Sequence, residues 1–440
     1  MNQDCAILGA GMTGLAAGWA SGLQVYEAAK EPGGICSSYY VRPNSKEALA
    51  RRPEDGEAYR FEIGGGHWIF GGDPAVLKFI RTLTSVKSYS RSSAVYFPRN
   101  NLYVPYPIQN HLRSLDRATA DKALHEMINP PKEIQKTMAG WLEQNFGPTL
   151  TELFFGPFHK LYTAGLWKEI APQDPYKSPV NIAHAIAGAA DETKPVGYNV
   201  AFVYPREGLN TLAQRLTDKN QIHFGKRVVK IELDRKEINF DDGSSKNYKT
   251  LISTLPLNKM MEICGLRVDE EPDPYTSVLV LNIGAKKGPQ CPGEHWLYIP
   301  QSKSRFHRVG FYSNVDSSFL PKSSREMNNL VSIYVERAYA NGLRPEETTI
   351  ENYGQAVVAE LQSWGFIEGA EVVHPTWIDV AYTWSRPGSN WRDKALKILE
   401  ENDIYMIGRY GRWIFQGIAD SIKDGLSVGT AFKTGSTNLS

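Results

Sequence analysis

Three glycines near the amino terminus have the spacing of a turn that binds phosphate groups. Gly9, Gly11 and Gly14 form a GxGxxG pattern between the apolar run CAIL and the small-residue stretch GLAAGWA. Between a strand and a helix, the first glycine permits a tight turn, the second lets the backbone approach a pyrophosphate, and the third lets the helix pack on the strand. The helix N-terminus then faces the negative charge. The pattern therefore predicts a strand, a turn and a helix that bind a dinucleotide.

An acidic residue follows these glycines at the end of a second apolar run. The run LQVYE ends in Glu27, where a carboxylate accepts hydrogen bonds from ribose hydroxyls and disfavours a 2′-phosphate. NADP is therefore not expected at this site. Because Glu27 follows the glycines by fewer than the customary ~20 residues, we expect a helix over 14–21 that is shorter than usual. A lone GxGxxG is weak evidence, but the two flanking runs and the acid strengthen it.

A second pair of glycines bears on whether the expected dinucleotide is FAD or NAD. Gly33 and Gly34 lie in EPGG, shortly after the acidic residue; an ordinary surface turn is the alternative interpretation. The stretch GAGMTGLAAG…VYEAAKEPGGICSS resembles the FAD fingerprint of the amine oxidase and protoporphyrinogen oxidase superfamily. Further motifs are closest to its UDP-galactopyranose mutase-like branch. The resemblance implies that FAD is the cofactor and that the amides of the glycine pair lie against the flavin side of the pyrophosphate.

Two later motifs resemble parts of this superfamily that lie beside the flavin. GGGHWIF is similar to a loop that runs along the flavin ring, where glycines allow the backbone to come close. His67 could tune the flavin or donate to a reacting group, or it could be satisfied by loop carbonyls. In IGRYGRWIFQGIADSI, Gly408 and Arg409 resemble the pair that ends the last strand of the FAD domain. The helix that follows would direct its N-terminus at the flavin.

Motifs expected to form a substrate site resemble those of the mutases. YVPYPIQN, which begins at Tyr103, is similar to a strand beside the flavin, and LYTAGLW is similar to the YTxxxW segment beside the nucleotide. On one helix Tyr162 and Trp167 would lie on roughly similar sides, where they could stack on a uracil or a sugar; aromatic core residues are the alternative. FHRVGFYSN places Arg308 at the position of a mutase arginine near the sugar diphosphate, with Arg305 as the rival if the register slips. A guanidinium fork suits a diphosphate.

Several positions depart from the mutase pattern. Phe415 stands where the mutases carry a diphosphate-binding tyrosine, and Gly417 stands near their acidic position. The letters KSPVN occupy the place of another expected arginine. Tyr382, in VAYTWSRP, resembles a mutase tyrosine but lacks the proline that follows it there. We therefore do not expect a diphosphate site identical to that of the mutases.

The resemblance assigns residues to three roles, with Val228 and Val229 expected to contact the adenine through their main chain. The residues expected to bind FAD are Gly9, Gly11, Met12, Thr13, Gly14, Glu27, Ala28, Gly33, Gly34, Ile35, Gly65, Gly66, His67, Trp68, Val228, Val229, Gly408, Arg409, Gly417 and Ile418. The residues expected to take part in catalysis are His67, Arg308 and Arg409. The residues expected to bind substrate are Tyr103, Tyr162, Trp167, Arg308, Tyr382 and Phe415.

The resemblance and the strand and helix patterns together predict how these motifs are positioned. We expect an α/β fold with α+β insertions, in which a Rossmann-type, glutathione-reductase-like FAD-binding domain is discontinuous over 1–100, 200–262 and 400–440. A substrate domain is inserted between its parts, with helices over 101–199 and a mixed or antiparallel sheet over 263–399. Cofactor-binding pieces thus alternate along the chain with substrate-facing pieces.

Local patterns add detail to this layout. Alternating aromatics around an Asn-Asn turn predict a hairpin, and residues 112–166 have a mostly helical pattern. Residues 222–256 are predicted as a β-meander that closes in an apolar strand. A buried strand beginning near 404 precedes a helix from about Ala419, and the charged segment 42–60 is expected to be exposed.

Bulk composition limits the classes of function. The chain has 440 residues, 42% of them hydrophobic, and 49 basic against 48 acidic side chains, which gives a net charge of +1. This length predicts more than one domain, and the balanced charge gives no reason to expect a nucleic acid as partner. The four cysteines lack CxxC spacing, so no metal site is expected and a cytoplasmic location with reduced thiols fits best. No apolar run approaches the ~20 residues of a membrane span.

Two enzyme classes remain open. The resemblance to the mutases implies a flavoenzyme that interconverts pyranose and furanose forms of a nucleoside-diphosphate sugar, with reduced FAD forming a sugar adduct through its N5 atom. The alternative is an FAD-dependent oxidoreductase of the amine oxidase or protoporphyrinogen oxidase type, which removes hydride from its substrate; the lost phosphate ligands favour it, whereas a polar cleft would disfavour a very apolar substrate. A homodimer is a further option, and a flavin-bearing scaffold without activity is the least supported reading.

Overall fold

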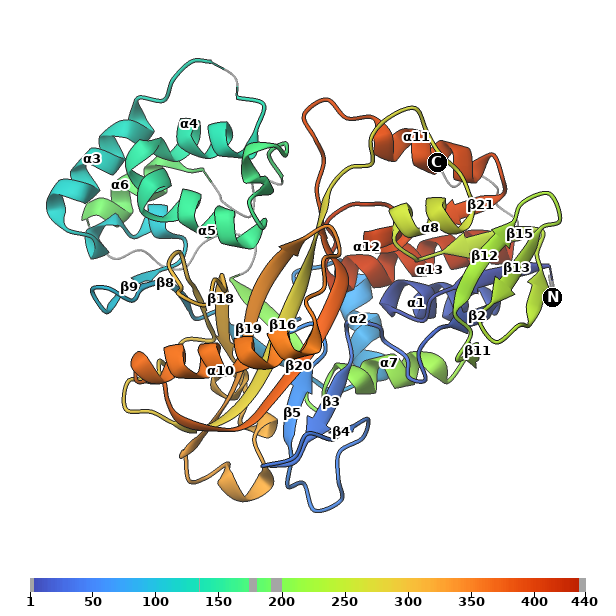
Figure 1. The fold of residues 1–440 in the computed structure, drawn as a ribbon, viewed down its shortest axis with the longest axis horizontal. Helices are drawn as coiled ribbons and strands as arrows, with labels where there is room; N and C mark the ends of the chain where they lie inside the picture. Colours follow the sequence, from blue (N-terminus) through green and yellow to red (C-terminus); the bar gives the residue numbers. More distant parts are fainter. Residues whose placement is uncertain (1–3, 134, 174–179, 191–199, 435–440) are drawn as a thin grey trace.

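The structure is a computed structural model that describes residues 4–133, 135–173, 180–190 and 200–434. Figure 1 shows three regions side by side. A sheet with helices lies toward the amino terminus, a large twisted sheet lies in the middle, and a group of helices lies at the opposite end.

A parallel five-stranded sheet is assembled from segments that are far apart in the sequence. Its strands, in spatial order, are β11 (Gln221–Phe224), β2 (Gln24–Glu27), β1 (Cys5–Leu8), β15 (Thr250–Ser253) and β21 (Ile404–Met406). All four residues of β1 are buried, as expected of a central parallel strand covered on both faces. The carboxyl ends of the strands therefore meet at one edge, where ligands bind in open α/β sheets.

Two helices pack closely beside this sheet because glycines line their contact. They are α1 (Met12–Ser21) and α13 (Ile418–Thr434). A Cβ on Gly425 would lie 2.2 Å from the carbonyl oxygen of Thr13, and one on Gly429 would lie 2.3 Å from that of Ala17. Only residues without a side chain allow these backbones to approach so closely. The short helix expected over 14–21 is confirmed, with its first turn two residues earlier.

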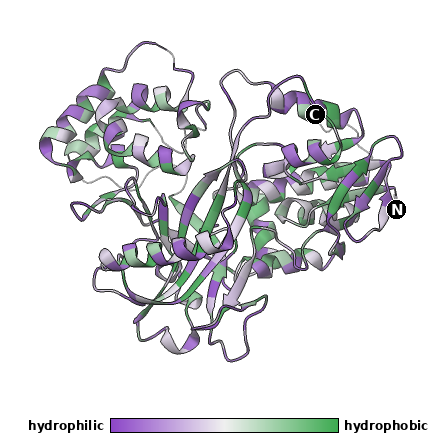
Figure 2. Cartoon of the chain, in the orientation of Figure 1, coloured by the Kyte–Doolittle hydropathy of each residue, from purple (hydrophilic) through white to green (hydrophobic). Residues whose placement is uncertain are grey.

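The central sheet has seven strands that are antiparallel except for one pair. In spatial order they are β20 (Ile367–Thr383), β16 (Tyr275–Lys287), β19 (Leu330–Ala340), β18 (Arg308–Phe311), β17 (Trp296–Tyr298), β8 (Ser93–Phe97) and β9 (Leu102–Pro105). β17 and β8 are parallel. Helix α10 (Glu347–Ser363) packs on β20 and crosses the sheet in Figure 1. In Figure 2 the strands of this sheet carry both hydrophobic and hydrophilic residues. Most residues of β16 and β19 are buried, so both faces of these two strands are covered.

The hairpin predicted around the Asn-Asn turn is confirmed as β8 and β9. Asn101 adopts a left-handed backbone conformation with φ +49° at the turn. The hairpin belongs to the central sheet, so the domain division expected between residues 100 and 101 falls inside it. The division of the chain into domains stays a prediction.

The helices at the far end form a compact group with its own apolar core. They are α3 (Arg117–Ile128), α4 (Met138–Leu150), the π-helical turn η3 (Thr151–Phe155), α5 (Gly156–Tyr162), the 3-10 turn η4 (Leu166–Lys168) and α6 (Ile182–Ala190). The helical pattern predicted for 112–166 is therefore confirmed. Phe146 and Phe155 stack at 4.3 Å between ring centroids inside this core.

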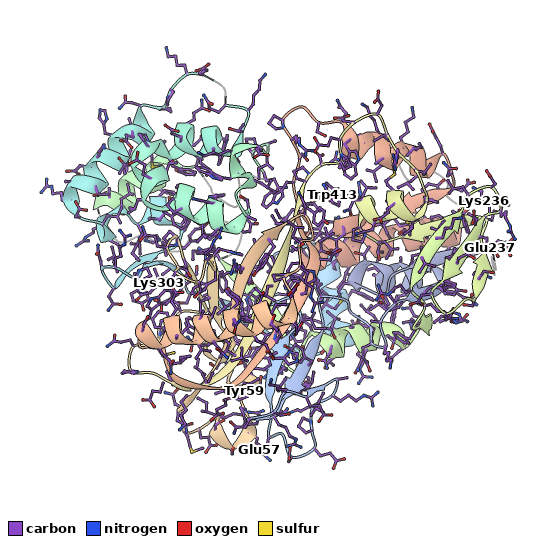
Figure 3. The ribbon with its side chains drawn as sticks, in the orientation of Figure 1. Glu57, Tyr59, Lys236, Glu237, Lys303 and Trp413 are labelled. Carbon is purple, nitrogen blue, oxygen red and sulfur yellow. The ribbon has the colours of Figure 1, made fainter. Side chains whose placement is uncertain are left out.

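Three small sheets complete the strand inventory of the described residues. They are β4 (Ala48–Leu49) with β3 (Ser38–Val41) and β5 (Tyr59–Glu62); β6 (Ile69–Phe70) with β10 (Ala201–Pro205) and β7 (Val86–Ser90); and β12 (Val228–Glu232) with β13 (Glu237–Phe240) and β14 (Ser245–Asn247). Figure 3 shows Lys236 and Glu237 at the outer end of the β12–β13 hairpin. The meander predicted over 222–256 is correct only for β12–β14. β11 and β15 join the parallel sheet instead, and the last three residues of β15 are buried, as in a covered parallel strand.

The remaining short elements connect these sheets. The helices are α2 (Pro74–Leu83), α7 (Leu209–Thr217), α8 (Leu257–Ile263), α9 (Tyr312–Val315), α11 (Trp391–Glu400) and α12 (Gly408–Gly411). The 3-10 turns are η1 (Ile108–Asn110), η2 (Leu112–Ser114), η5 (Ser317–Phe319) and η6 (Lys322–Ser324). In the segment 42–60, expected to be exposed, Arg42 and Asp55 form an ion pair with both side chains about half exposed, and strand β4 pairs with β3.

Two searches of the described residues bear on membranes and metals. Within the described part of the chain, no helix has both the length and the apolar character needed to cross a bilayer. Among the same residues, no group of three or more His, Cys, Asp or Glu side chains is arranged to hold a metal ion. All four cysteines are free thiols.

Candidate functional site

The glycine-rich turn lies between β1 and α1 and leaves space for a ligand at one position. Gly9 has φ +94°, and a Cβ there would lie 2.3 Å from Oγ1 of Thr254. A Cβ on Gly14 would lie 1.9 Å from the carbonyl oxygen of Gly9, so this glycine is required for the helix to meet the strand. A Cβ on Gly11, by contrast, meets no atom within 4 Å. The backbone of the turn is therefore open at Gly11, where a pyrophosphate would approach.

The second glycine pair closes over the same turn. The amide of Gly33 donates to the carbonyl of Ala10 at 2.8 Å, and Gly11 and Gly33 form a parallel β-bridge. Gly33 and Gly34 both have positive φ, +104° and +56°, which a residue with a side chain rarely adopts. Gly11 precedes α1 without a side-chain cap, so amides of the first helical turn remain available for an anion.

The residues expected on the adenosine side lie together at the ends of β2 and β11. Glu27 accepts hydrogen bonds from the amides of Ala10 (2.6 Å) and Ala29 (2.8 Å). The amide of Lys226 donates to the carbonyl of Glu27 at 2.8 Å, which brings the connection from β11 to β12 beside Ala28 and Ala29. Val228 begins β12 just beyond, and the exposed fraction of the next residue, Val229, is 49%.

A cavity of about 470 Å³ extends from the glycine turn to the central sheet and the helical group. It gathers many of the residues named from the sequence. Those expected to bind FAD that line it are Gly11, Met12, Thr13, Gly33, Gly34, Ile35, Gly66, His67, Trp68, Gly408, Arg409, Gly417 and Ile418. Those expected to bind substrate or catalyse that line it are His67, Tyr162, Arg308, Tyr382, Arg409 and Phe415. The structure therefore brings the two sets of residues into one continuous space.

The loop before β6 presents His67 to this cavity. A Cβ on Gly66 would lie 2.1 Å from the hydroxyl oxygen of Tyr334, so the loop packs directly on the central sheet. The Nδ1 atom of His67 is buried, and it has no hydrogen-bond partner among the described residues. Burial, with the nearby charge of Arg409, lowers the pKa of His67 to about 4. The imidazole is therefore neutral at neutral pH.

Arg308 is held by a carboxylate that the sequence patterns did not single out. Its Nε donates to Oε2 of Glu336 at 2.9 Å and its Nη2 donates to Oε1 at 2.7 Å. The two residues face each other across the strands β18 and β19. Glu336 is 1% exposed, and Nε2 of His307 lies 3.5 Å from it. Although burial alone would raise its pKa, Arg308 and His307 hold the pKa of Glu336 at about 2. The guanidinium fork expected to meet a diphosphate is thus occupied by an ionised side chain.

Arg409 is fixed differently, by main-chain carbonyls. Its Nη1 donates to the carbonyl of Gln416 at 3.2 Å and its Nη2 to that of Ala381 at 3.0 Å. The guanidinium lies 4.6 Å from the centre of the Phe415 ring. These partners are neutral, so they orient the positive charge of Arg409 in the cavity without cancelling it.

Two residues expected to bind substrate, Trp167 and Tyr103, do not line the cavity. Tyr162 and Trp167 do not share a helix, because α5 ends at Tyr162 and Gly165 turns the chain with φ +99°. Trp167 packs against Gly156 in the helical group instead. The prediction that Tyr162 and Trp167 lie on similar sides of one helix is therefore wrong. Tyr103 lies on β9 and packs on Tyr96 at 4.6 Å between ring centroids, within the core of the central sheet.

An aromatic wall that the sequence analysis did not identify lines the cavity. Its members come from η3 and α5, from β17 and from the segment after β9, and they are Phe154, Phe155, Phe158, Tyr106 and Tyr298. Tyr106 and Tyr298 pack at 4.3 Å between ring centroids. The spacing FFxxFxxxY in the sequence carried this signal, since it repeats near the period of a helix. The lining of the cavity is more apolar than expected from the sequence. The polar cleft expected there was the argument against a very apolar substrate.

A second buried carboxyl group supports the loop that presents His67. Glu62 is fully buried at the end of β5 and accepts hydrogen bonds from the hydroxyls of Ser38 (2.8 Å) and Tyr204. Tyr204 in turn packs on Trp68 at 5.0 Å between ring centroids. Burial raises the pKa of Glu62 to about 7, against the lowering effects of Tyr204 and Arg60. The carboxyl group therefore changes its charge near neutral pH.

Replacement of Glu62 by glutamine is expected to remove a pH dependence of stability. The folded pKa of about 7 lies above the ordinary value of 4.5, so the folded state holds the proton more tightly than the unfolded state. Its contribution is full below the ordinary value and is lost as the pH rises through 7. Between about pH 5 and about pH 8, urea denaturation should show a loss on the order of 2 kcal/mol in the wild type and much less in Glu62→Gln. The Glu54→Gln variant, at an exposed position, is the control, and equal slopes in the wild type and Glu62→Gln would contradict the assignment.

Comparison with known proteins identifies the family. The model of the family described as flavin containing amine oxidoreductase matches residues 15–427. The chain belongs to this family. A crystal structure of reduced UDP-galactopyranose mutase has a TM-score of 0.81 and 21% identity, covering 99% of this chain and 97% of that chain. A fatty acid isomerase from P. acnes that produces CLA has a TM-score of 0.60 and 15% identity, covering 98% of both chains. A putrescine oxidase bound to putrescine has a TM-score of 0.57 and 13% identity, covering 99% of both chains.

As a flavin amine oxidoreductase family member, the protein is an FAD-dependent enzyme with the expected α/β fold and inserted α+β parts. The residues present fit this cofactor. The open position at Gly11, the positive-φ glycines 33 and 34, and the uncapped first turn of α1 form a cradle that a pyrophosphate would complete. The segment KSPVN stands where the mutases carry a further arginine, and most of it lies outside the described residues.

Proposed function

We propose that this family member is an isomerase that acts on a nucleoside-diphosphate sugar, in the manner of the UDP-galactopyranose mutases. The observation that carries the proposal is that Tyr162, Arg308, Tyr382 and Phe415 line the same cavity as the flavin cradle. The similarity of fold to a UDP-galactopyranose mutase over nearly the full length of both chains supports it. In its reduced form FAD supplies a nucleophile for the anomeric carbon of a sugar.

The residues of the chain would bind and orient such a substrate. Phe154 and Phe158 of the aromatic wall, with Tyr162 beside Phe158, offer ring faces on which a nucleobase can stack. Burial raises the pKa of Tyr162 well above its ordinary value, and burial likewise raises the pKa of Tyr382. Both hydroxyls therefore keep their protons and can donate hydrogen bonds to sugar or phosphate oxygens.

The charged residues around the expected substrate position include a neutral pair and a cation that donates hydrogen bonds to main-chain carbonyls; Arg91 also lines the cavity. Arg308 and Glu336 neutralise each other, and the remaining hydrogen atoms of the pair suit the hydroxyls of a sugar. Arg409 is held only by carbonyls, so its charge favours an anionic group. His67 is neutral at neutral pH, so one nitrogen of its imidazole can donate a hydrogen bond and the other can accept one.

The test is turnover of sugar nucleotides by protein that carries reduced flavin. We expect dithionite-reduced protein, and not oxidised protein, to interconvert the ring forms of at least one nucleoside-diphosphate sugar, measured by chromatography. Tyr162→Ala should lower kcat/KM by about tenfold or more, because it removes a stacking surface. Trp167→Phe is the matched control, since Trp167 lies outside the cavity. Absence of turnover and of a trapped flavin–sugar adduct with every sugar nucleotide tried would overturn the proposal.

The second candidate is an FAD-dependent oxidoreductase. It is favoured by the apolar character of the aromatic wall and by Glu336, which occupies the fork of Arg308. Phe415 also lacks the hydroxyl that a diphosphate-binding tyrosine would supply. Steady oxygen consumption with release of peroxide on addition of an amine would support this candidate in place of the isomerase.

A further inference from the structure

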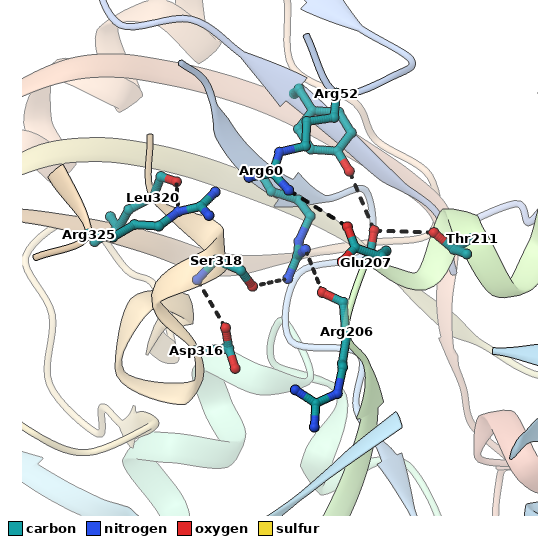
Figure 4. Close-up of polar contacts among 10 residues, drawn as sticks. Arg52, Arg60, Arg206, Glu207, Thr211, Asp316, Ser318, Leu320 and Arg325 are labelled. Atoms are coloured by element: carbon teal, nitrogen blue, oxygen red, sulfur yellow. Dashed lines mark hydrogen bonds and ion pairs between the residues drawn. The ribbon is translucent and has the colours of Figure 1, made fainter. Parts of the chain in front are cut away.

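Three arginines from separate parts of the chain gather away from the cavity. Arg52 lies between β4 and β5, Arg60 lies in β5, and Arg325 follows η6. Figure 4 shows the side chain of Arg325 pointing toward Arg60, with Arg52 above Arg60 in this view. None of the three lines the cofactor and substrate cavity.

Arg60 is the fixed member of this cluster. It is 2% exposed, its Nη1 donates to the carbonyl of Arg206 at 3.2 Å, and its Nη2 donates to the hydroxyl of Ser318 at 3.0 Å. Its guanidinium lies 4.1 Å from the centre of the Phe319 ring. These partners are neutral, so they position a buried positive charge without cancelling it. Such a charge is costly unless an anion lies near.

Arg325 and Arg52 add two more positive charges beside it. The Nε of Arg325 donates to the carbonyl of Leu320 at 3.1 Å, which leaves the end of its guanidinium to face the cluster. The pKa of Arg325 lies below its ordinary value because the group is partly desolvated and because Arg52 and Arg60 repel its charge. The three guanidinium groups are therefore close enough to disfavour one another.

The nearby carboxyl groups are engaged by other partners. Against the lowering effect of burial, Glu62 and Asp316 raise the pKa of Arg60, but Glu62 already accepts hydrogen bonds from the hydroxyls of Ser38 and Tyr204. Asp316 already accepts from the hydroxyl of Tyr89 (2.7 Å), the ammonium of Lys87 (3.0 Å) and the amide of Ser318 (3.0 Å). Glu207 lies 3.7 Å from Arg52, and its side chain is 65% exposed. An exposed pair at this distance contributes little. Positive charge is thus in excess at this place among the described residues.

We propose that Arg52, Arg60 and Arg325 form a binding site for a phosphate-type oxyanion. Guanidinium groups bind such oxyanions through two parallel hydrogen bonds, and a multivalent anion would relieve the repulsion among three cations. A carboxylate carries only one negative charge and would relieve less of it. Inorganic phosphate and the phosphate group of a metabolite share this chemistry. The site is separate from the proposed isomerase site and does not depend on it.

The test measures binding to flavin-loaded protein, in which the pyrophosphate cradle is filled by the cofactor. Inorganic phosphate should raise Tm relative to sodium chloride of equal ionic strength, and calorimetry should give a saturable Kd. The double variant Arg52→Gln/Arg325→Gln should weaken the binding about tenfold or more, because two charge-assisted contacts are lost. Both side chains are at least partly exposed, so the variant should fold. Arg51→Gln, the exposed neighbour, is the matched control and should bind as the wild type does.

Two further arms assign the ligand and its location. Tighter binding of glycerol 3-phosphate than of inorganic phosphate would favour a metabolite, and equal binding would favour free phosphate as the ligand. Arg409→Gln should keep the phosphate response, since Arg409 lies in the cavity. The proposal is overturned if the double variant responds like the wild type, if the wild type shows no saturable binding, or if only Arg409→Gln abolishes it. Because no arm measures turnover, failure of the isomerase proposal would leave the result intact.

Discussion

Glu336→Gln is expected to lower the free energy of unfolding by about 3 kcal/mol, because it leaves the guanidinium of Arg308 without its counter-charge. The carboxylate is almost fully buried and accepts two parallel hydrogen bonds from Arg308. A neutral amide can accept one of them but brings an N–H group toward the cation. Urea denaturation at neutral pH measures the loss.

The same pair predicts a pH dependence in acid. The folded pKa of Glu336, about 2, lies below its ordinary value of 4.5, so its stabilising contribution is present above that value and is lost as the pH falls toward 2. Glu336→Gln should not show this part of the acid-induced loss.

The control for Glu336→Gln removes both charges. Glu336→Gln/Arg308→Met should recover a large part of the stability lost in the single variant, because no unpaired charge remains buried. If the double variant is as unstable as the sum of its single variants, the two side chains do not act as a pair, and the assignment fails.

Gly11→Val is expected to abolish binding of FAD, by at least about hundredfold in affinity, while the protein remains folded. Gly11 has φ −70°, which any residue adopts, and a Cβ there meets no protein atom within 4 Å. The valine side chain would instead fill the space left for the pyrophosphate. The ratio of flavin absorbance to protein absorbance after reconstitution measures the effect, with circular dichroism to show that the fold is kept.

Two other glycines separate the cradle from general effects of substitution. Gly369→Val is the matched control, since a Cβ there also meets no atom within 4 Å, but Gly369 lies on β20, and it does not line the cavity. It should bind flavin normally. Gly14→Ala should instead impair folding itself, because its Cβ would overlap the carbonyl of Gly9. Normal flavin content in Gly11→Val would show that the pyrophosphate lies elsewhere.

The parts of the fold that could be predicted from the sequence are those set by local chain geometry. The turn of Gly9, Gly11 and Gly14 and the acid at the end of β2 lie within one continuous strand–helix–strand unit, so spacing alone indicates their arrangement. The β8–β9 hairpin was predictable for the same reason, because a short turn fixes the pairing of its strands.

The contacts that could not be predicted depend on strand register and on single turns. Arg308 and Glu336 meet only because β18 and β19 pair with these residues opposite each other, 28 positions apart in the sequence. Trp167 was misplaced because one left-handed residue, Gly165, breaks the helix that the spacing assumed. Tyr103 was misplaced because alternate residues of a strand face opposite sides, and its own side is the core.

The parallel sheet has a consequence for synthesis on the ribosome. β1 and β2 emerge first, but β15 and β21, which extend the sheet on the other side of β1, follow about 240 and 400 residues later. One edge of the amino-terminal strand, with its backbone N–H and C=O groups, therefore stays unpaired until most of the polypeptide has been translated. Loading of the cofactor is consequently expected as a late step, after release, and chaperones that shield exposed strand edges should raise the yield of holoenzyme.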